Sequence, residues 1–170
     1  MNPMNGRVLL ISKDQTVGAN IARHISERDW GVESTEEEQT AYAVLKEKPV
    51  DVVIMVLKRL EKDCLRIIKQ IGRIRPAVEI VTINNSNEVK LSIKCMKAGV
   101  FDDMYPPLDM DLLVRRITEA VETKEKSIRT ARRKLSRFDR MMLAISFAEA
   151  GDPDTAKTYL QKKNKGKKNG

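Results

Sequence analysis

The stretch that most constrains the fold is a solid apolar run at residues 50–57, with Asp51 as its only polar member. Alternating apolar and polar residues would predict a strand with one face in water. A continuous run rich in β-branched residues predicts a strand buried on both faces. Pro49 separates this run from the helical pattern before it. We therefore expect a central strand of a parallel sheet that ends at Val56 and Leu57, where ligands of open α/β sheets bind.

Strand-like and helix-like patterns alternate five times before residue 123. Apolar runs predict strands at residues 7–12, 32–35, 50–57, 77–83 and 100–105. Helical spacing predicts helices at 16–28, which Trp30-Gly31 should end, and at 36–48, 63–75, 88–97 and from Met110 onward. Right-handed crossovers then place helices on both faces. We predict an α/β fold with a doubly wound, five-stranded parallel sheet and an all-α C-terminal extension.

Composition limits the classes of protein that this chain can represent. Hydrophobic residues make up 41% of the 170 residues, which supports a real core. No apolar run approaches 18 residues, so we expect no membrane span, and the first seven residues lack the apolar stretch of a signal peptide. We interpret Cys64 and Cys95 as reduced thiols of a cytoplasmic protein.

The net charge of +8 is unevenly distributed along the chain. Residues 124–170 hold 14 Lys and Arg against 5 Asp and Glu, whereas residues 1–123 hold 18 against 19. This split indicates two functional parts. We predict an α/β domain at 1–123, a long helix with a helical hairpin at 124–161, and a disordered basic tail at 162–170.

Short segments at characteristic spacings indicate a family. They are Leu9-Leu10-Ile11-Ser12-Lys13, Asp51-Val52-Val53, Asp63, Ile80-Val81-Thr82, Ala98-Gly99-Val100-Phe101-Asp102 and Pro107. Together they make residues 7 to about 123 resemble the receiver domain of bacterial two-component response regulators. The resemblance implies a flavodoxin-like fold and a role in signal transduction.

The same resemblance implies that the phosphorylation pocket is degenerate. Ser12 and Lys13 stand at the positions of the family's acidic, cation-binding pair, Val56 at the acceptor aspartate, Pro106 at the lysine that contacts the phosphoryl group, Asp103 at the aromatic switch position and Thr82 at the Thr or Ser position. Of these, only Thr82 matches the family. Cys64 also replaces the family's glycine. The resemblance thus predicts a pseudo-receiver with no catalytic residue.

Chemistry supports that prediction. Magnesium prefers carboxylate oxygens, and an acyl phosphate needs a carboxylate nucleophile. Asp51 lies at the wrong end of its strand, while Asp14 and Asp63 are either a displaced site or, as we prefer, helix-capping residues. One hypothesis places the Lys13 ammonium where receivers hold the cation, near Asp102 or Asp63; the alternative leaves it in solvent.

No other catalytic centre is predicted. His24 is the only histidine, so a His-dependent metal cluster or catalytic triad is not available. No glycine-rich phosphate-binding loop occurs either. We therefore expect no enzyme activity, no metal and no cofactor.

Beyond residue 123 the helical pattern continues. Residues 111–150 contain neither Pro nor Gly, and an apolar stripe continues at 3-4 spacing with a polar break at Lys124. This pattern predicts a coiled-coil seam. The seam needs a homodimeric or other helical partner, or its own C-terminal segment folding back. Its candidate partner-binding residues are Ile128, Leu135, Phe138, Met142 and Ile145.

A helical turn is predicted after this stretch. Gly151 suits a helix end, Asp152 a cap and Pro153 a first helical position. The small and aromatic residues from Leu143 to Leu160 resemble a single tetratricopeptide repeat, although about three repeats are needed to bury a solenoid core.

Basic residues are dense on the same helix and in the tail. Candidate polyanion-binding residues are Arg129, Arg132, Arg133, Arg137 and Arg140. A solvated helix face is the simpler interpretation, since no known nucleic-acid-binding motif appears. Our first hypothesis is a phosphorylation-independent regulator that acts through protein contacts. The alternatives are a nucleic-acid-binding regulator and a receiver phosphorylated at an unusual residue.

Overall fold

A computed structural model describes residues 6–57, 63–85 and 89–149 of the chain. The elements are β1 (Arg7–Ser12), α1 (Gln15–Ser26), β2 (Gly31–Thr35), α2 (Glu38–Glu47), β3 (Val52–Leu57), α3 (Cys64–Ile74), β4 (Glu79–Asn84), α4 (Val89–Lys97), β5 (Asp102–Met104) and α5 (Met110–Glu149). The strands form one parallel sheet in the order β2-β1-β3-β4-β5. The predicted fold class is confirmed.

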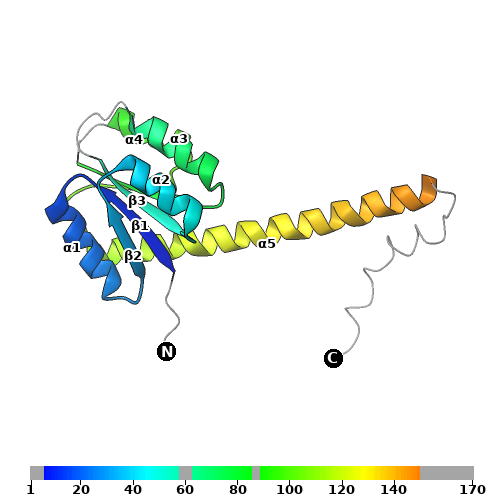
Figure 1. Ribbon diagram of the computed structural model, residues 1–170, viewed down its shortest axis with the longest axis horizontal. Helices are drawn as coiled ribbons and strands as arrows, with labels where there is room; N and C mark the ends of the chain where they lie inside the picture. The colour runs from blue at the N-terminus through cyan, green and yellow to red at the C-terminus, as the bar shows by residue number, and fades with distance from the viewer. Residues whose placement is uncertain (1–5, 58–62, 86–88, 150–170) are drawn as a thin grey trace. The chain divides into compact units, whose positions relative to one another are not determined.

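Helices cover both faces of the sheet (Figure 1). One hydrophobic cluster joins one face of the sheet to α2, α3 and α4, and the other joins the opposite face to α1 and α5. All six residues of β3 are buried, as the unbroken apolar run predicts. The strand therefore lies at the centre of the core, with its carboxyl end at the edge where a site is expected.

The connection between α1 and β2 differs from the prediction. We expected Gly31 to end the first helix, but α1 ends at Ser26 and Gly31 is the first residue of β2. Asp29 instead takes the left-handed conformation, with φ of 62°. Aspartate tolerates that region better than most residues, because its short side chain can hydrogen-bond locally. Trp30, which lies between Asp29 and Gly31 in the sequence, is buried in the core.

The end of β1 and the start of α1 are in close contact. A Cβ atom added at Gly18 would lie 3.2 Å from the Cβ of Ser12, so glycine lets the helix approach the strand end. Asp14 caps α1 by accepting a hydrogen bond from the Val17 N–H at 3.1 Å. The geometry of this corner fixes where Ser12 lies.

The chain divides into two units, Met1–Glu125 and Lys126–Gly170. The helix α5 contributes to both, because it runs from Met110 to Glu149. Its first part belongs to the α/β unit, where Leu113, Ile117 and Ala120 are fully buried in the core. The stripe that we predicted as one seam therefore begins as part of the core.

Lys124 has a structural role that the pattern did not predict. Its Nζ lies 2.8 Å from Asp51 Oδ1, and the Arg7 N–H donates to Asp51 Oδ2 at 2.9 Å. We had interpreted Lys124 as a polar break in a seam and Asp51 as a residue at the remote end of the strand. The position of Asp51 agrees with that interpretation, but Lys124 folds onto the α/β unit.

Candidate functional site

Register brings the predicted pocket positions to the carboxyl edge of the sheet. Ser12 pairs with Val56 between β1 and β3, and Met55 pairs with Thr82 between β3 and β4. Thr82 in turn pairs with Asp103 between β4 and β5. Pro106 follows β5 and joins Pro107 through a cis peptide bond. Adjacent strands thus carry the positions that the resemblance aligned with the phosphorylation pocket.

Ser12 is buried and its hydroxyl is occupied locally. The hydroxyl donates to the Asp14 carbonyl oxygen at 2.9 Å and accepts from the Asp14 N–H at 3.2 Å. Because the Asp14 carboxylate caps α1, its position agrees with the helix-cap interpretation. The first strand therefore presents a neutral hydroxyl here, with no carboxylate at the position of Ser12.

A small cavity of about 90 Å³ lies at this edge, beside Val56. Lys13 and Asp63 both line it, together with Glu36 and Glu38, and its floor is apolar. Lys13 is exposed. Asp63 precedes α3 and its side chain does not cap that helix. The cavity therefore combines one cation with several carboxylates around an apolar acceptor position.

Asp102, one of the two carboxylates proposed to lie near Lys13, lies elsewhere, and Glu38 of the cavity is paired with an arginine. Asp102 forms an ion pair with Arg116 of α5, with Oδ2 and Nε 3.0 Å apart, so it does not line the cavity with Lys13. Glu38 receives two hydrogen bonds from Arg66, at 2.6 and 2.9 Å. This pairing holds the pKa of the Glu38 carboxyl below its ordinary value, against the effect of burial.

Thr82 and Asp103 form the most specific contact of the site. Thr82 is fully buried, and its hydroxyl donates to Asp103 Oδ1. The other carboxylate oxygen, Oδ2, is buried and has no hydrogen-bond partner among the described residues. The Asp103 N–H also donates to Asp102 Oδ1 at 2.9 Å. The Thr and switch positions are thus joined directly, side chain to side chain.

Sequence reasoning did not find this bond or the Arg116 ion pair. Thr82 and Asp103 were singled out one at a time, as a matching and a departing position. The signal that could have joined them is the strand register, since β4 and β5 are adjacent and parallel. The Arg116 pair could not be found from the pattern, because it depends on how α5 packs beside β5.

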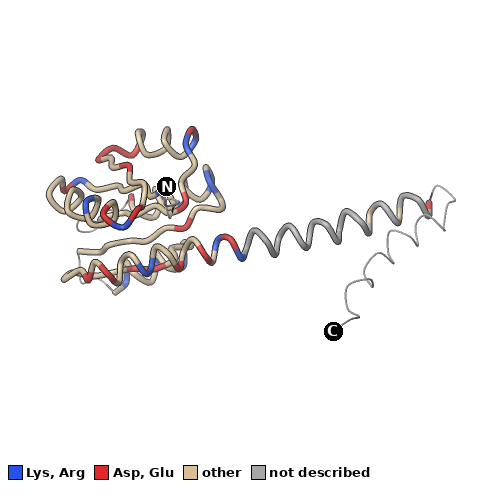
Figure 2. Tube along the Cα trace, turned by 90° about the horizontal axis from the view of Figure 1, so that it is seen from below, with Lys and Arg blue, Asp and Glu red and all other residues tan. Residues whose placement is uncertain are grey.

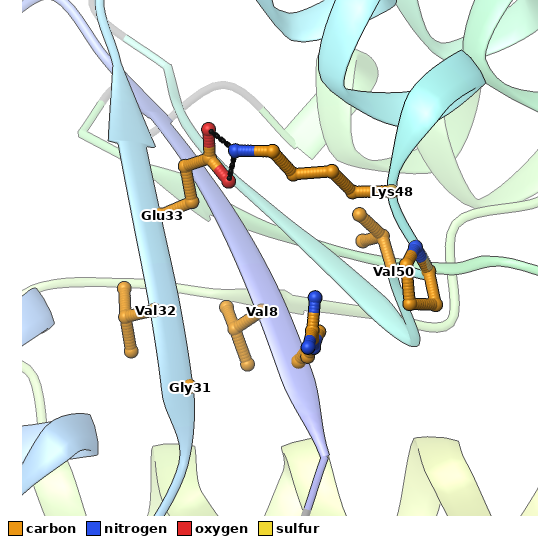
Figure 3. Close-up of a pocket in the computed structure, with 8 residues that line it drawn as sticks. Val8, Gly31, Val32, Glu33, Lys48 and Val50 are labelled. Atoms are coloured by element: carbon orange, nitrogen blue, oxygen red, sulfur yellow. Dashed lines mark hydrogen bonds and ion pairs between the residues drawn. The ribbon is translucent and has the colours of Figure 1, made fainter.

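A second hollow of about 180 Å³ lies at the opposite, amino edge of the sheet, and Figure 3 shows its lining. Val8, Val32 and Val50 supply apolar surface there, and Lys48 forms an ion pair with Glu33 at 2.9 Å. The pair neutralises both charges. Arg7 also lines this hollow, but the lining residues include no nucleophile that would define a chemical site.

The two cysteines lie in the core of the α/β unit. Neither Cys64 nor Cys95 forms a disulfide, both are fully buried, and burial raises the pKa of Cys95 to about 12. Among the described residues, no three His, Cys, Asp or Glu side chains are grouped to hold a metal ion. Across those same residues, no helix is long and apolar enough to cross a membrane.

The predicted residues of the long helix are only partly described. Met142 and Ile145 are exposed. The side chains of Ile128, Leu135 and Phe138, and those of Arg129, Arg132, Arg133, Arg137 and Arg140, lie outside the described residues, as do the predicted hairpin and basic tail after residue 149.

Comparison with known proteins identifies the class. The response regulator receiver domain matches residues 8–118 of this chain, so the chain belongs to the response regulator receiver family, whose proteins act in signal transduction. The predicted resemblance to receivers is confirmed at this level.

Individual relatives agree with the family. The transcriptional regulatory protein ZraR of Salmonella typhimurium is 26% identical over 120 residues, which cover 69% of this chain and 27% of ZraR. A putative NtrX-like response regulator of Rickettsia conorii is 25% identical over 117 residues, covering 68% of this chain and 25% of that protein. This chain therefore spans about a quarter of the length of these relatives.

Solved structures share the fold. A receiver domain protein from Clostridium thermocellum superposes with a TM-score of 0.65 at 21% identity, over 71% of this chain and 97% of the other. NtrX from Brucella abortus, solved with ADP, superposes with a TM-score of 0.70 at 15% identity, over 82% of this chain and 34% of the other. The second likeness covers more of this chain than the first.

Proposed function

We propose that this chain is a phosphorylation-independent receiver, without catalytic activity, that acts through protein contacts made by its long C-terminal helix. Val56 carries this proposal. It is the last residue but one of the buried central strand, at the position that the resemblance aligns with the acceptor aspartate, and its isopropyl side chain has no atom that can attack phosphorus.

The neighbouring groups support the same function. Ser12 supplies a hydroxyl already bonded to Asp14, and Lys13 supplies a positive charge where magnesium would need oxygen ligands. Pro106 has no cationic group to neutralise a phosphoryl oxygen. Thr82 is hydrogen-bonded to Asp103, so its hydroxyl is already engaged within the protein. In this proposal the nucleophile, the cation ligands and the cationic side chain are all missing, and the one matching hydroxyl is bonded within the protein.

We expect no phosphoryl transfer to the full chain. Incubation with acetyl phosphate and magnesium should leave the intact mass unchanged, because no carboxylate stands at Val56. Mass spectrometry under conditions that preserve acyl phosphates measures this, with a phosphorylatable receiver as positive control. A mass increase that maps to Asp14 or Asp63 would overturn the proposal in favour of a displaced acceptor.

A second variant distinguishes two reasons for the absence of phosphoryl transfer: missing side-chain groups and an altered pocket shape. The double substitution Lys13→Asp with Val56→Asp restores two of the carboxylates. If this variant still binds magnesium weakly and takes no phosphoryl group, the shape of the pocket has diverged as well. If it is phosphorylated, the substituted residues alone account for the lost chemistry.

The helix supplies the means of contact in this proposal. Its apolar stripe continues beyond Lys126, past the α/β unit, and Met142 and Ile145 on that stripe are 47% and 43% exposed. Large exposed apolar side chains repeated on one helix indicate an association surface. A second copy of this chain, paired in parallel or antiparallel orientation, would cover the stripe without any other protein.

A second function is favoured by charge and by the relatives. Residues 124–170 carry 14 Lys and Arg against 5 Asp and Glu, and ZraR is a transcriptional regulatory protein. A regulator of this kind would bind nucleic acid through the basic helix and tail. Phosphate contacts release counterions, so such binding weakens steeply with salt.

For this second function, we expect the affinity for DNA or RNA to fall as salt rises, with a slope that decreases by about one for each phosphate contact removed. The substitutions Arg132→Ala and Arg133→Ala, and a chain ending after Asn164, remove such contacts. Fluorescence anisotropy at several salt concentrations measures the slope. Equal slopes for all variants would exclude the basic helix and tail as the binding surface.

A further inference from the structure

Two thiols lie against each other in the core of the α/β unit. Cys64 is the first residue of α3, Cys95 lies on the buried face of α4, and both are 0% exposed in the same hydrophobic cluster. The two thiols are within hydrogen-bonding reach of each other, and this contact adds to the effect of burial on the pKa of Cys95. They are the only cysteines of the chain, so a disulfide within one molecule has to join these two residues.

The cysteine pair adjoins two parts of the altered pocket. Asp63, which precedes Cys64, lines the small cavity at the carboxyl edge of the sheet. The Asp103 carboxylate, which accepts the hydrogen bond from Thr82, is close enough to act on the Cys95 thiol through its charge. A bond between the two sulfur atoms would therefore connect the helix that begins at the cavity to the helix that lies beside Asp103.

We propose that Cys64 and Cys95 form a redox-active dithiol, which a small disulfide oxidant converts into an intramolecular disulfide between α3 and α4. Buried cysteines are ordinarily inert, and two features distinguish this pair. Side chains that are already in contact require less backbone movement to reach disulfide geometry. Cys64 also stands at a helix end, and helix ends open more readily than helix centres. The dithiol takes no part in phosphoryl chemistry or in the long helix, so it is separate from the proposed function.

The reaction is a thiol–disulfide exchange in two steps. The Cys64 thiolate attacks one sulfur of the oxidant, whose S–S bond breaks, so a mixed disulfide forms and one small thiol leaves. The Cys95 thiolate then attacks the Cys64 sulfur, the bond between the two cysteines forms, and the second small thiol leaves. The two cysteines lose two electrons and two protons, which the two released thiols gain.

Burial determines the order of these steps. A thiol with a pKa of about 12 is almost entirely protonated at neutral pH, and only the thiolate is an effective nucleophile, so Cys95 is a poor first attacker. Cys64 is exposed first when the beginning of α3 opens. The same opening admits water to Cys95 and removes the burial that raises its pKa, which permits the second step.

The charges around the pair favour an anionic oxidant. Basic and acidic segments are interspersed over the α/β unit as a whole (Figure 2), but α3 and α4 contain no aspartate or glutamate. The exposed basic residues of these two helices are Arg66, Lys69, Arg73, Lys90, Lys94 and Lys97. Glutathione disulfide carries more carboxylates than ammonium groups, so this surface raises its local concentration.

The test incubates the folded full chain with glutathione disulfide and measures the intact mass without reductant. We expect a loss of about 2 Da, the mass of the two thiol hydrogens, with no glutathione adduct and no covalent dimer. Tryptic digestion should give the peptide of Cys64 joined to that of Cys95, and dithiothreitol should separate them. The oxidised chain should keep its circular dichroism spectrum and unfold at a urea concentration higher by about 1 M, because the bond constrains the unfolded chain.

Two variants test whether the contact in the core selects the partner. Cys95→Ser removes the thiol that attacks second, so a glutathione adduct should accumulate on Cys64. Cys95→Ser with Met96→Cys keeps two cysteines but moves one of them to a position of α4 that is 46% exposed. This variant should form adducts or covalent dimers, with an internal disulfide yield lower by about tenfold or more.

Three results would each overturn the proposal. An unchanged mass of the folded chain, with a disulfide formed only in urea, would show that the pair does no more than fill the core. Equal yields of internal disulfide from the natural chain and from the variant with Met96→Cys would show that the contact does not select the partner. An oxidised chain that unfolds at a lower urea concentration than the reduced chain would show that the fold does not accommodate the bond.

Discussion

A chain that ends after Lys126 is expected to be a monomer, whereas the full chain is expected to be a dimer. The shorter chain keeps the whole unit Met1–Glu125, including the ion pair between Lys124 and Asp51, and loses the exposed part of the apolar stripe. Light scattering coupled to size exclusion measures the two masses. An end at Thr123, which the sequence alone would suggest, removes Lys124 and would confuse lost association with lost stability.

Charge placed on the stripe provides a second route to the same result. Met142→Glu with Ile145→Glu puts carboxylates at two exposed apolar positions of the full-length helix, and charge in an apolar seam opposes pairing. Ala144→Glu adds a carboxylate on the opposite side of the helix from the stripe by spacing, and should leave the mass unchanged. A full chain that is already a monomer would show that the stripe is covered within one molecule or by another protein.

Replacing Lys124 with methionine is expected to lower the free energy of unfolding by about 2 kcal/mol at neutral pH. The side chain of Lys124 is 15% exposed and that of Asp51 is 31% exposed, so the pair is largely shielded from water. Removing the ammonium leaves the Asp51 carboxylate partly buried, with only the Arg7 N–H as a described donor. Glu79 is also partly buried, and the Lys124 ammonium acts on its carboxyl by electrostatic attraction.

The effect should depend on pH in a definite direction. Burial alone would raise the pKa of Asp51, but hydrogen bonds from Lys124 and from the Arg7 N–H outweigh it and hold the pKa below its ordinary value. A lowered pKa contributes stability above the unfolded-state pKa, and that contribution is lost as the pH falls through the folded-state pKa. The difference in free energy of unfolding between the natural chain and the variant should therefore shrink in acid.

Glu79 adds to the same trend. Burial raises the pKa of its carboxyl, and Lys124 partly offsets the rise. A raised pKa favours the fold at low pH, and this benefit disappears as the pH rises and the buried group must ionise. Loss of Lys124 makes that ionisation less favourable. The free energy of unfolding of the variant should therefore fall most at neutral pH and least in acid.

Urea unfolding at neutral pH and at about pH 3 measures both effects. The matched control is Lys48→Met, which removes an ion pair of similar length from the surface, where Lys48 and Glu33 are 48% and 40% exposed. Exposed pairs contribute about 0.2–1 kcal/mol, so its effect should be small. Equal losses for both variants, or a Lys124 effect that does not depend on pH, would contradict a role for burial.

The sheet could be predicted because its signals are local. The unbroken apolar run of β3 and the shorter runs of β1 and β4 each record a strand buried on both faces, and alternation with helical spacing implies parallel strands. The departures at Ser12, Lys13, Val56 and Pro106 were equally visible, since they are identities at fixed spacings. The ends of helices were harder to predict. The chain leaves α1 through the left-handed residue Asp29, whereas the sequence pointed to Gly31, two residues further on.

The long helix shows the limit of a periodic pattern. One apolar stripe runs through Ile117 and Met142, yet the first side chain is fully buried in the domain core and the second is exposed. Periodicity reports that a face is apolar and carries no information about what covers it. The chain divides at Lys126, two residues beyond the contact of Lys124 with Asp51, and no spacing along the helix encodes that point.

By itself, the sequence determined the order of elements, the parallel sheet and the non-acidic identities of Ser12, Lys13 and Val56, which the resemblance aligns with the family's acidic positions, because these depend on residue identity and short-range spacing. Only the tertiary structure decided which polar groups meet. Thr82 bonds Asp103 across 21 residues and Lys124 bonds Asp51 across 73, and both bonds require a particular strand register and helix packing. Partners so distant in sequence are selected by the folded core, which brings them within reach and shields them from water.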